Sequence, residues 1–414
     1  MPRLLRIPTR IAPVLVAATV LVVAATACVP TTPTIASVTY RGKVANPSAP
    51  GIRRDGATSV LLGGKVVWAF GDSFAIGAST LWSSTAALAT PAAPLSLSEP
   101  TVNVGGGNLG PASTMIPKTA AEAADEAAHA GLHYLYWPGS IIPEANGTSA
   151  IVFSEHLRSQ DVCDAGGQNC HQQLDSLGLN VARLQANATT ATNLGDIIPA
   201  PAKFLNSIFL DPTSGTVYLY DCSASAPDLH GTLGLCKVAK VDRANMLTRS
   251  AYRFYDGTNW VTDIAAAVPT VPGNGGSIQW NAYLQTYISL NINGAIRWKP
   301  DGKPDLDPNG LPQADWVAEQ LRTSFSPFGA ASDWSTPITA CGTPNATPAP
   351  PAGCTFDPAT IADHFPYAER IHPALSSADG RTIALSWYVP DAQPTDWFKG
   401  DVKVYDLTFG PKPS

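Results

Sequence analysis

Two aspartates at the open end of a predicted β-hairpin are the first candidates for chemistry in this sequence. Two apolar strands within residues 54–74 are joined by Gly63-Gly64, a dipeptide typical of a two-residue hairpin turn. Pairing outward from this turn places Asp55 opposite Asp72. Opposed Cβ atoms lie about 4.5–5.5 Å apart, where two like charges destabilise a purely structural hairpin. A close carboxyl pair is what glycoside hydrolysis uses, one as proton donor and one as base or nucleophile. The competing interpretation is two solvated aspartates at strand ends.

The strands that position this pair belong to a recurring unit. Similar strand–turn–strand patterns recur at four further turns, Asn146-Gly147, Ser214-Gly215, Tyr283 and Asp379-Gly380. Five such hairpins, about 70–95 residues apart, predict an all-β fold, a five-bladed β-propeller of four-stranded blades. A β-sandwich with long loops is the alternative architecture. We expect Val402–Tyr405 to close the last blade, and Thr119–Gly131 to form a short helix or ordered excursion between blades.

Counting residues from each turn predicts which side chains share one mouth of the propeller funnel. Asp55 and Asp72 are the expected catalytic pair, and six residues are expected to bind substrate: Trp137, Glu155, Asp221, Asn281, His372 and Trp387. Trp82, Trp137 and Trp387 are candidates to stack on sugar rings, against the alternative that each packs in the core. His372 alone is also explained as a buried structural histidine. Glu155 and Asp221 are alternative acids.

The N-terminus predicts export. Residues 1–28 combine three arginines, an apolar run and Ala25-Thr26-Ala27-Cys28, a sequence similar to a lipobox in which Cys28 is lipidated. Cleavage without a lipid and an uncleaved anchor are the alternatives; the apolar run is short for a membrane span. We expect a tether over residues 29–37 and a single domain over residues 38–414, either at the extracellular face of the cell membrane or secreted.

Charge and composition exclude several partner classes. Loss of the three arginines before Cys28 takes the net charge from −6 to −9. An acidic surface argues against nucleic acid and anionic lipid as partners, so we expect contact with membrane only through the N-terminal lipid. Charged residues make up only 14%, while Gly (34) and Pro (37) are abundant, as in turn-rich β proteins.

The seven cysteines predict disulfides rather than a metal site. With Cys28 set aside, six remain in close sequential pairs: Cys163 with Cys170, Cys222 with Cys236, and Cys341 with Cys354. Neighbour pairing is the simplest of the fifteen connectivities. A zinc site is disfavoured because the sequence has no CxxC and its histidines do not cluster with the cysteines. We expect no cofactor and no metal; a structural calcium in the funnel has no ligand motif to support it. Ser73 lacks the Gly-x-Ser-x-Gly context of a hydrolase serine.

Several segments resemble a known family. They are Asp55-Gly56, Trp68–Phe74, Tyr136–Gly139, Trp280–Leu284 and Tyr367–Leu375. Together they are similar to the family catalogued as domain of unknown function 4185, whose characterised members are endo-D-arabinanases, five-bladed propeller glycoside hydrolases of actinobacteria and some gut bacteria. The resemblance covers roughly Val38 to Phe409, with long insertions around 90–130 and 340–360. The two family aspartates fall on Asp55 and Asp72.

The resemblance implies hydrolysis of α-D-arabinofuranosyl linkages in cell-wall arabinan, in arabinogalactan or lipoarabinomannan. We expect the protein to be a monomer. Two other functions stay open: a glycan-binding surface lipoprotein that does not cut, and a different propeller hydrolase acting on L-arabinan or fructan. The sequence also leaves open which aspartate is the acid, whether configuration is retained or inverted, and whether cleavage is endo or exo.

Overall fold

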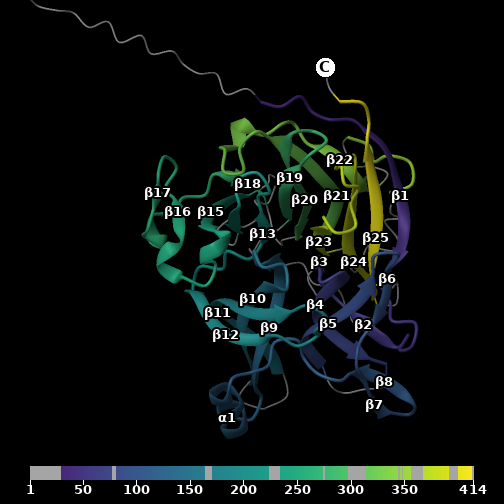
Figure 1. Cartoon of the computed structure of the whole chain (residues 1–414), viewed down its shortest axis with the longest axis vertical. Coiled ribbons are helices and arrows are strands. Elements are labelled where there is room, and N and C mark those ends of the chain that lie inside the picture. The colour runs from purple at the N-terminus through teal and green to yellow at the C-terminus, as the bar shows by residue number, and fades with distance from the viewer. Residues whose placement is uncertain are drawn as a thin grey trace, which may run out of the picture.

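The computed structural model describes residues 29–76, 81–163, 170–222, 234–273, 276–296, 314–343, 346, 348–355, 367–390 and 400–412. Within them, strands dominate and α1 (Ala120–Ala128) is the one α-helix. Five antiparallel sheets stand around a central axis as the blades of a five-bladed β-propeller (Figure 1), which confirms the fold class predicted above.

Each blade begins at the axis and continues outward. Blade 1 contains β2 (Ile52–Arg54), β3 (Ala57–Leu62), β4 (Lys65–Ala75), β5 (Leu81–Thr90) and β6 (Ala93–Ser98). Blade 2 contains β9 (Leu132–Pro143), β10 (Ser149–Cys163), β11 (Cys170–Gln185) and β12 (Thr192–Pro199). Blade 3 contains β13 (Ser207–Leu210), β14 (Thr216–Asp221), β15 (Leu235–Asp242), β16 (Arg253–Tyr255), β17 (Trp260–Val261) and β18 (Val271–Pro272).

Blades 4 and 5 complete the ring. Blade 4 contains β19 (Ser277–Asn281), β20 (Thr286–Ile296), β21 (Ala314–Ser324) and β22 (Ile338–Gly342). Blade 5 contains β23 (Tyr367–Ile371), β24 (Thr382–Pro390), β25 (Gly400–Phe409) and, as its outermost strand, β1 (Ile35–Lys43). The five turns predicted from the sequence all join the first two long strands of a blade, at equivalent places.

The ring is closed by the N-terminal strand rather than by the C-terminal segment alone. Val402–Tyr405 lies in β25, the third strand of blade 5, and β1 pairs with β25 as the fourth strand, with Val38 opposite Leu407. Val402–Tyr405 therefore does not complete blade 5 by itself. Without β1 the outer edge of β25 would be unpaired, and the N-terminal end of the chain supplies the strand that pairs with it. β1 already begins at Ile35, within the expected tether.

The excursion between blades 1 and 2 carries a hairpin and the helix. β7 (Thr101–Gly105) pairs with β8 (Asn108–Pro111), and α1 follows. A capping box fixes the start of α1, because the Thr119 side chain accepts from the Glu122 N–H and Glu122 accepts from the Thr119 N–H. The helix is held on blade 2 by His156, whose Nε2 lies 2.9 Å from Glu122 Oε1 and whose Nδ1 lies 3.0 Å from Asp196 Oδ2.

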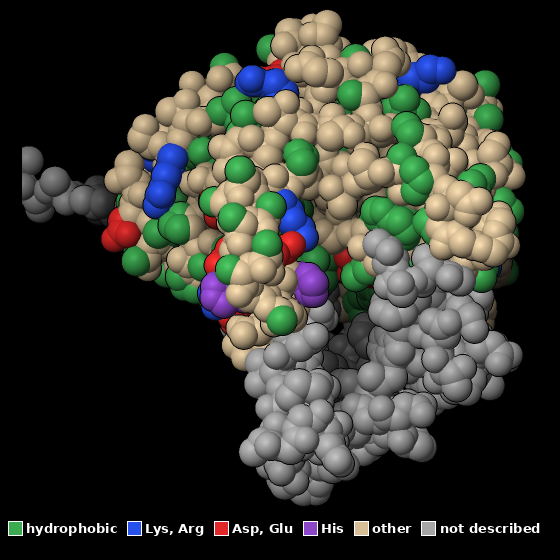
Figure 2. All heavy atoms as spheres, turned by 90° about the horizontal axis from the view of Figure 1, so that it is seen from below, with side chains coloured by type: hydrophobic (Ala, Val, Ile, Leu, Met, Phe, Trp, Pro, Cys, Tyr) green, Lys and Arg blue, Asp and Glu red, His purple; other side chains and the backbone are tan. Residues whose placement is uncertain are grey.

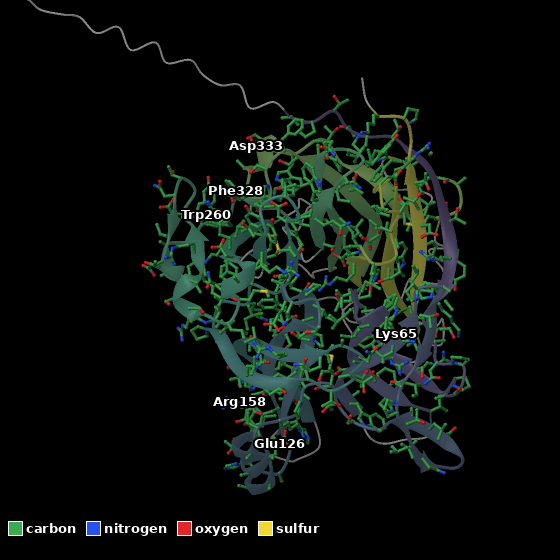
Figure 3. All side chains as sticks on the ribbon, viewed as in Figure 1. Lys65, Glu126, Arg158, Trp260, Phe328 and Asp333 are labelled. Carbon is green, nitrogen blue, oxygen red and sulfur yellow. A yellow bond between two sulfur atoms is a disulfide. The ribbon has the colours of Figure 1, made fainter. Side chains whose placement is uncertain are left out.

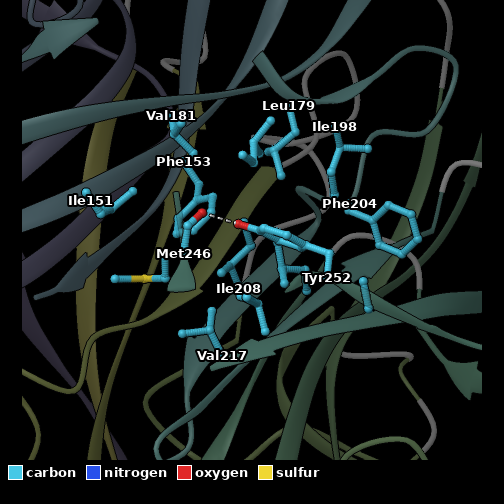
Figure 4. Close-up of a cluster of buried hydrophobic side chains, with 14 of the residues drawn as sticks. Ile151, Phe153, Leu179, Val181, Ile198, Phe204, Ile208, Val217, Met246 and Tyr252 are labelled. Carbon is cyan, nitrogen blue, oxygen red and sulfur yellow. Dashed lines mark hydrogen bonds between the residues drawn. The ribbon is translucent and has the colours of Figure 1, made fainter. Parts of the chain in front are cut away.

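The apolar core lies between neighbouring blades, because each sheet buries both faces against the next one. Figure 4 shows the cluster between blades 2 and 3, where the Tyr252 hydroxyl donates to the Met246 carbonyl at 2.7 Å. In Figure 3, Trp260 and Phe328 lie together at the edge of blades 3 and 4; their rings are 5.2 Å apart, edge to face. This packing holds the innermost strands, and so the axial site, in fixed positions.

Candidate active site

The two aspartates lie at the end of blade 1 opposite the Gly63-Gly64 turn. The predicted register is confirmed, with Ala57 opposite Phe70 and Ser59 opposite Trp68. Asp55 occupies the break between β2 and β3, where its N–H donates to the Asp72 carbonyl at 3.0 Å. The pair therefore extends the hairpin register beyond the regular strand.

Two glycines make this close approach possible. Gly56 has φ +45°, a left-handed conformation that turns the chain between β2 and β3. A Cβ on Gly71 would stand 2.8 Å from Asp55 Oδ1. A side chain at Gly71 would displace the Asp55 carboxylate, whereas one at Gly56 would strain the left-handed backbone beside it.

Asp55 has two donors aimed at its carboxylate, one from each side. Oδ1 accepts the Asp72 backbone N–H at 2.6 Å, and Oδ2 accepts the Tyr367 hydroxyl at 2.9 Å. Burial raises the pKa of Asp55, and the two donors oppose that rise because they stabilise the ionised form. The ionised form of Asp55 is therefore stabilised by two donors inside a buried site.

Asp72 is also buried, but it has one side-chain donor and lies beside the charge of Asp55. Burial first, and then the charge of Asp55, raise the pKa of Asp72 to about 7, while the Trp137 indole opposes the shift by donating to Oδ1 at 3.0 Å. A carboxyl group with a pKa near 7 keeps a proton to give at neutral pH. This arrangement makes Asp72 a candidate proton donor and Asp55 a candidate base or nucleophile.

Both aspartates open into a cavity of about 450 Å³ at this end of the propeller axis. Its wall comes from four blades, as the remaining lining residues show: Gly56, Gly71, Trp137, Pro138, Gly139, Glu155, Lys203, Leu205, Asn206, Tyr367, Ala368 and Arg370. We call it the acid cavity. Lys203 Nζ lies 2.9 Å from Glu155 Oε1, so an ion pair forms part of the wall of the acid cavity. The cavity can hold a sugar ring between carboxylates, an indole and an ion pair.

Trp137 and Glu155 are the two predicted binding residues that line the acid cavity. Asp221 is buried behind it, where Oδ2 accepts the Lys203 N–H at 3.3 Å. Trp387 is fully buried and stacks on Tyr405 at 4.7 Å, which agrees with the core-packing alternative.

Asn281 and His372 lie away from the acid cavity, in the half of the propeller that carries the turns. Asn281 Nδ2 donates to the Gly380 carbonyl at 2.9 Å, linking two neighbouring turns. His372 is enclosed, with Nδ1 2.8 Å from Ser59 Oγ and Nε2 2.6 Å from Ser386 Oγ, and burial lowers its pKa to about 3. The turn between β23 and β24 spans residues 372–381, so His372 belongs to the turn itself. Counting seven residues back from Asp379 therefore does not lead to the cavity end of the strand.

Sequence reasoning did not single out three cavity residues. Tyr367 and Arg370 belong to the segment that carries the family resemblance, which was the available signal. Lys203 stands in the loop before β13 and had no signal in the sequence. Trp82, the other stacking candidate, lies on β5 against Gly110 and does not line the acid cavity.

A second and larger cavity, about 630 Å³, lies along the axis toward the turns. It is lined by the turn-side parts of all five innermost strands, and Gly139 and Arg370 border both cavities. Across the described residues, no group of three or more His, Cys, Asp or Glu is placed to hold a metal ion. Among the same residues, no helix is long and apolar enough to cross a membrane.

Two of the three predicted disulfides are present, Cys222–Cys236 and Cys341–Cys354. Cys163 and Cys170 are backbone partners at the end of the β10–β11 pair, but their side chains fall outside the described part of the chain, as does Cys28. Disulfides are consistent with an exported protein.

No family model and no curated protein matches this chain, so the family resemblance remains a resemblance. Solved structures with a similar arrangement include an exo-β-1,3-galactanase from Phanerochaete chrysosporium, at 12% identity and TM-score 0.46, over 89% of this chain and 64% of that one. An endo-1,5-α-L-arabinanase from Thermotoga petrophila is 9% identical with TM-score 0.41, over 91% and 76%. A β-xylosidase/α-arabinofuranosidase from a compost metagenome is 10% identical with TM-score 0.45, over 89% and 96%. The five-bladed arrangement rests on the sheet order given above, and the named activities belong to those proteins.

Proposed function

We propose that this protein is an exported glycoside hydrolase that cleaves α-D-arabinofuranosyl linkages within cell-wall arabinan. The observation that carries the proposal is the Asp55–Asp72 pair, two carboxyl groups with different hydrogen-bond donors in one cavity on the propeller axis. The arabinan specificity comes from the motif resemblance, and the solved glycoside hydrolases named above share the general reaction class.

Asp72 is the general acid in this proposal. Its proton passes to the glycosidic oxygen as the bond from that oxygen to the anomeric carbon breaks. Trp137 holds the Asp72 carboxyl through Nε1, and its half-buried indole lines the same cavity. The aromatic face offers the leaving sugar an apolar platform.

Asp55 supplies the negative charge. It either takes a proton from the attacking water, which inverts configuration, or attacks the anomeric carbon, which retains configuration through a covalent intermediate. In both cases the Tyr367 hydroxyl and the Asp72 N–H keep Asp55 ionised and oriented. In the retaining route the ionised Asp72 takes a proton from water, and the water oxygen displaces Asp55 from the anomeric carbon. In the inverting route Asp55 releases the proton it took to solvent, and Asp72 regains one from solvent.

The test uses the secreted domain, residues 29–414, with purified mycobacterial-type arabinogalactan. We expect reducing ends to appear as a ladder of oligosaccharides, since an endo-enzyme cuts within the chain. Asp72→Asn should lower turnover by about 10²–10⁴, the usual contribution of a general acid. Asp379→Asn is the matched control, because Asp379 is exposed in a turn at the far end of blade 5.

Each alternative has a distinct outcome. Arabinan binding without new reducing ends would make the protein a glycan-binding module. Free arabinose from the earliest time points would indicate exo cleavage. Products from L-arabinan or fructan alone would support the different hydrolase.

We also propose that the chain is exported through residues 1–28 and acylated on Cys28, and that it acts as a monomer. Incorporation of labelled fatty acid into the wild type, but not into Cys28→Ala, tests the acylation. Sedimentation of the soluble domain tests the oligomeric state.

A further inference from the structure

The segment that follows Cys28 is packed on the fold and does not hang free. Pro30 and Pro33 are buried, and the Thr34 carbonyl accepts the Gly410 N–H at 2.8 Å. Pro30 and Thr31 border a cavity of about 160 Å³ together with Leu284, Thr286, Thr323, Phe325 and Lys412. The chain before β1 is therefore fixed against blade 4.

Because this segment is attached to the fold, a lipid on Cys28 can lie only a short distance from the protein surface around Pro30. Only Val29 separates Cys28 from the buried Pro30, and an extended chain spans at most about 7 Å over those two residue steps. An acyl chain on Cys28 would therefore enter a bilayer next to the surface that surrounds Pro30. Diacylation gives stable anchoring, so the protein surface nearest the anchor is held at the lipid headgroups.

The surface at that point combines exposed apolar side chains with cations. We define the anchor patch as Val29, Tyr283, Leu284, Phe325, Arg381 and Lys412. Phe325 is 55% exposed and Val29 is 45% exposed. The Lys412 ammonium lies 5.2 Å from the centre of the Tyr283 ring and the Arg381 guanidinium 5.9 Å from it. Aromatic and basic side chains around apolar ones are typical of surfaces at the membrane interface.

The acidic side chain closest to the patch in sequence is already engaged. Asp379, two residues before Arg381, accepts from the Ser377 hydroxyl at 2.6 Å and from the Arg381 N–H at 3.0 Å. Figure 2 views the molecule from below, where Lys and Arg side chains are scattered and some lie beside Asp and Glu side chains.

The anchor patch and the acid cavity lie at opposite ends of the propeller. Leu284 is in the β19–β20 turn and Phe325 follows β21, at the end where all five inner turns stand. Asp72 lies eight residues beyond Gly64 on β4, which is about 26 Å at 3.3 Å per residue. A membrane at the turn end therefore leaves the acid cavity facing outward.

We propose that the anchor patch is the surface with which the acylated protein contacts a phospholipid bilayer, so that the acid cavity faces away from the membrane. This inference rests on the proposed acylation of Cys28 and is independent of the proposed hydrolase activity. The short, packed segment between Cys28 and β1 fixes the orientation, and the patch supplies the complementary surface.

Lysine footprinting of the full mature protein tests the orientation. The acylated protein is reconstituted on vesicles of phosphatidylcholine and phosphatidylglycerol and treated with a water-soluble amine-reactive reagent. Peptide mass spectrometry then compares Lys412 with Lys118, which is exposed in the excursion before α1. We expect a several-fold loss of Lys412 labelling on vesicles relative to detergent, with Lys118 unchanged. Cys28→Ala should show no such loss.

A second variant tests the patch itself. Phe325→Glu places a charge where lipid contact is proposed, so Lys412 should regain much of its labelling although the lipid is still attached. Leu174→Glu is the control, because Leu174 is 43% exposed on β11 in another blade. Equal labelling of Lys412 and Lys118 on vesicles would overturn the proposal, as would a Cys28 that carries no lipid. Arabinan hydrolysis in the same samples reports separately on the proposed enzyme function.

Discussion

The hydrogen bond from Tyr367 to Asp55 leads to a prediction that distinguishes a catalytic role of Tyr367 from a structural one. Replacing Tyr367 by Phe removes the hydroxyl that donates to Oδ2 at 2.9 Å and keeps the ring that lies 5.0 Å from Tyr388. The fold should persist. The ionised form of Asp55 should lose one of its two donors, since the Asp72 N–H remains in place.

The size of the effect follows from that lost bond. A hydrogen bond to a charged group contributes about 1.5–3 kcal/mol, and one pKa unit corresponds to about 1.4 kcal/mol. Because the lost donor favoured the ionised form, the pKa of Asp55 should rise. The proposed reaction needs Asp55 ionised, so the acidic limb of the kcat/KM profile should move to higher pH, and kcat/KM below that limb should fall by about 10–150-fold, the factor that about 1.5–3 kcal/mol gives.

The assay is release of reducing ends from arabinan across the pH range, with kcat/KM measured at each pH. Tyr40→Phe is the matched control, because Tyr40 is 49% exposed on β1, far from the cavity, and its ring contacts Tyr405. A uniform loss of rate with an unchanged acidic limb would refute the reasoning, because it would show that Tyr367 does not act on the ionisation of Asp55.

Three further predictions concern the acid, the fold and a disulfide. Trp137→Phe removes the donor that lowers the pKa of Asp72, so the alkaline limb of kcat/KM should move upward by about one unit; a shift of the acidic limb alone would contradict this. Asp72→Asn should stabilise the fold as well as inactivate it. The folded carboxyl keeps its proton up to about pH 7 whereas an unfolded one loses it near 3.8, so the wild type loses stability across that window. Denaturant titration should show a gain for the variant of about 4 kcal/mol at pH 8 and little at pH 4; equal gains at both values would disprove the cause given. Cys341→Ser with Cys354→Ser opens a loop with a sequence separation of 13 and should lower the free energy of unfolding by about 2–3 kcal/mol, seen as a lower unfolding midpoint under oxidising conditions; an unchanged midpoint would show that the bridge adds nothing.

The amino-acid sequence by itself determined the features that depend on local pairing. A two-residue turn at Gly63-Gly64 leaves one register for β3 and β4, so the approach of Asp55 to Asp72 could be counted from the turn. The recurrence of similar turns likewise predicted five blades, because each hairpin forms from residues close in the chain. Neighbouring cysteines paired for the same reason in Cys222–Cys236.

Counting failed where a turn was long. The residues between β23 and β24 make a ten-residue connection, over which no fixed register holds, so His372 lies against Ser59 instead of at the cavity. Alternation along a strand also did not reveal that Trp387 packs between sheets against Tyr405.

Only the tertiary structure shows which donors reach each aspartate. The decisive groups come from other blades, Trp137 from blade 2 and Tyr367 from blade 5, and they meet blade 1 only when the ring closes. A pKa depends on burial and on donors within a few ångströms, and residues about 65 and more than 300 positions away in the chain supply those donors here. Sequence spacing predicts that Asp55 and Asp72 lie close together. Packing between blades determines which donors each of the two carboxyl groups accepts from.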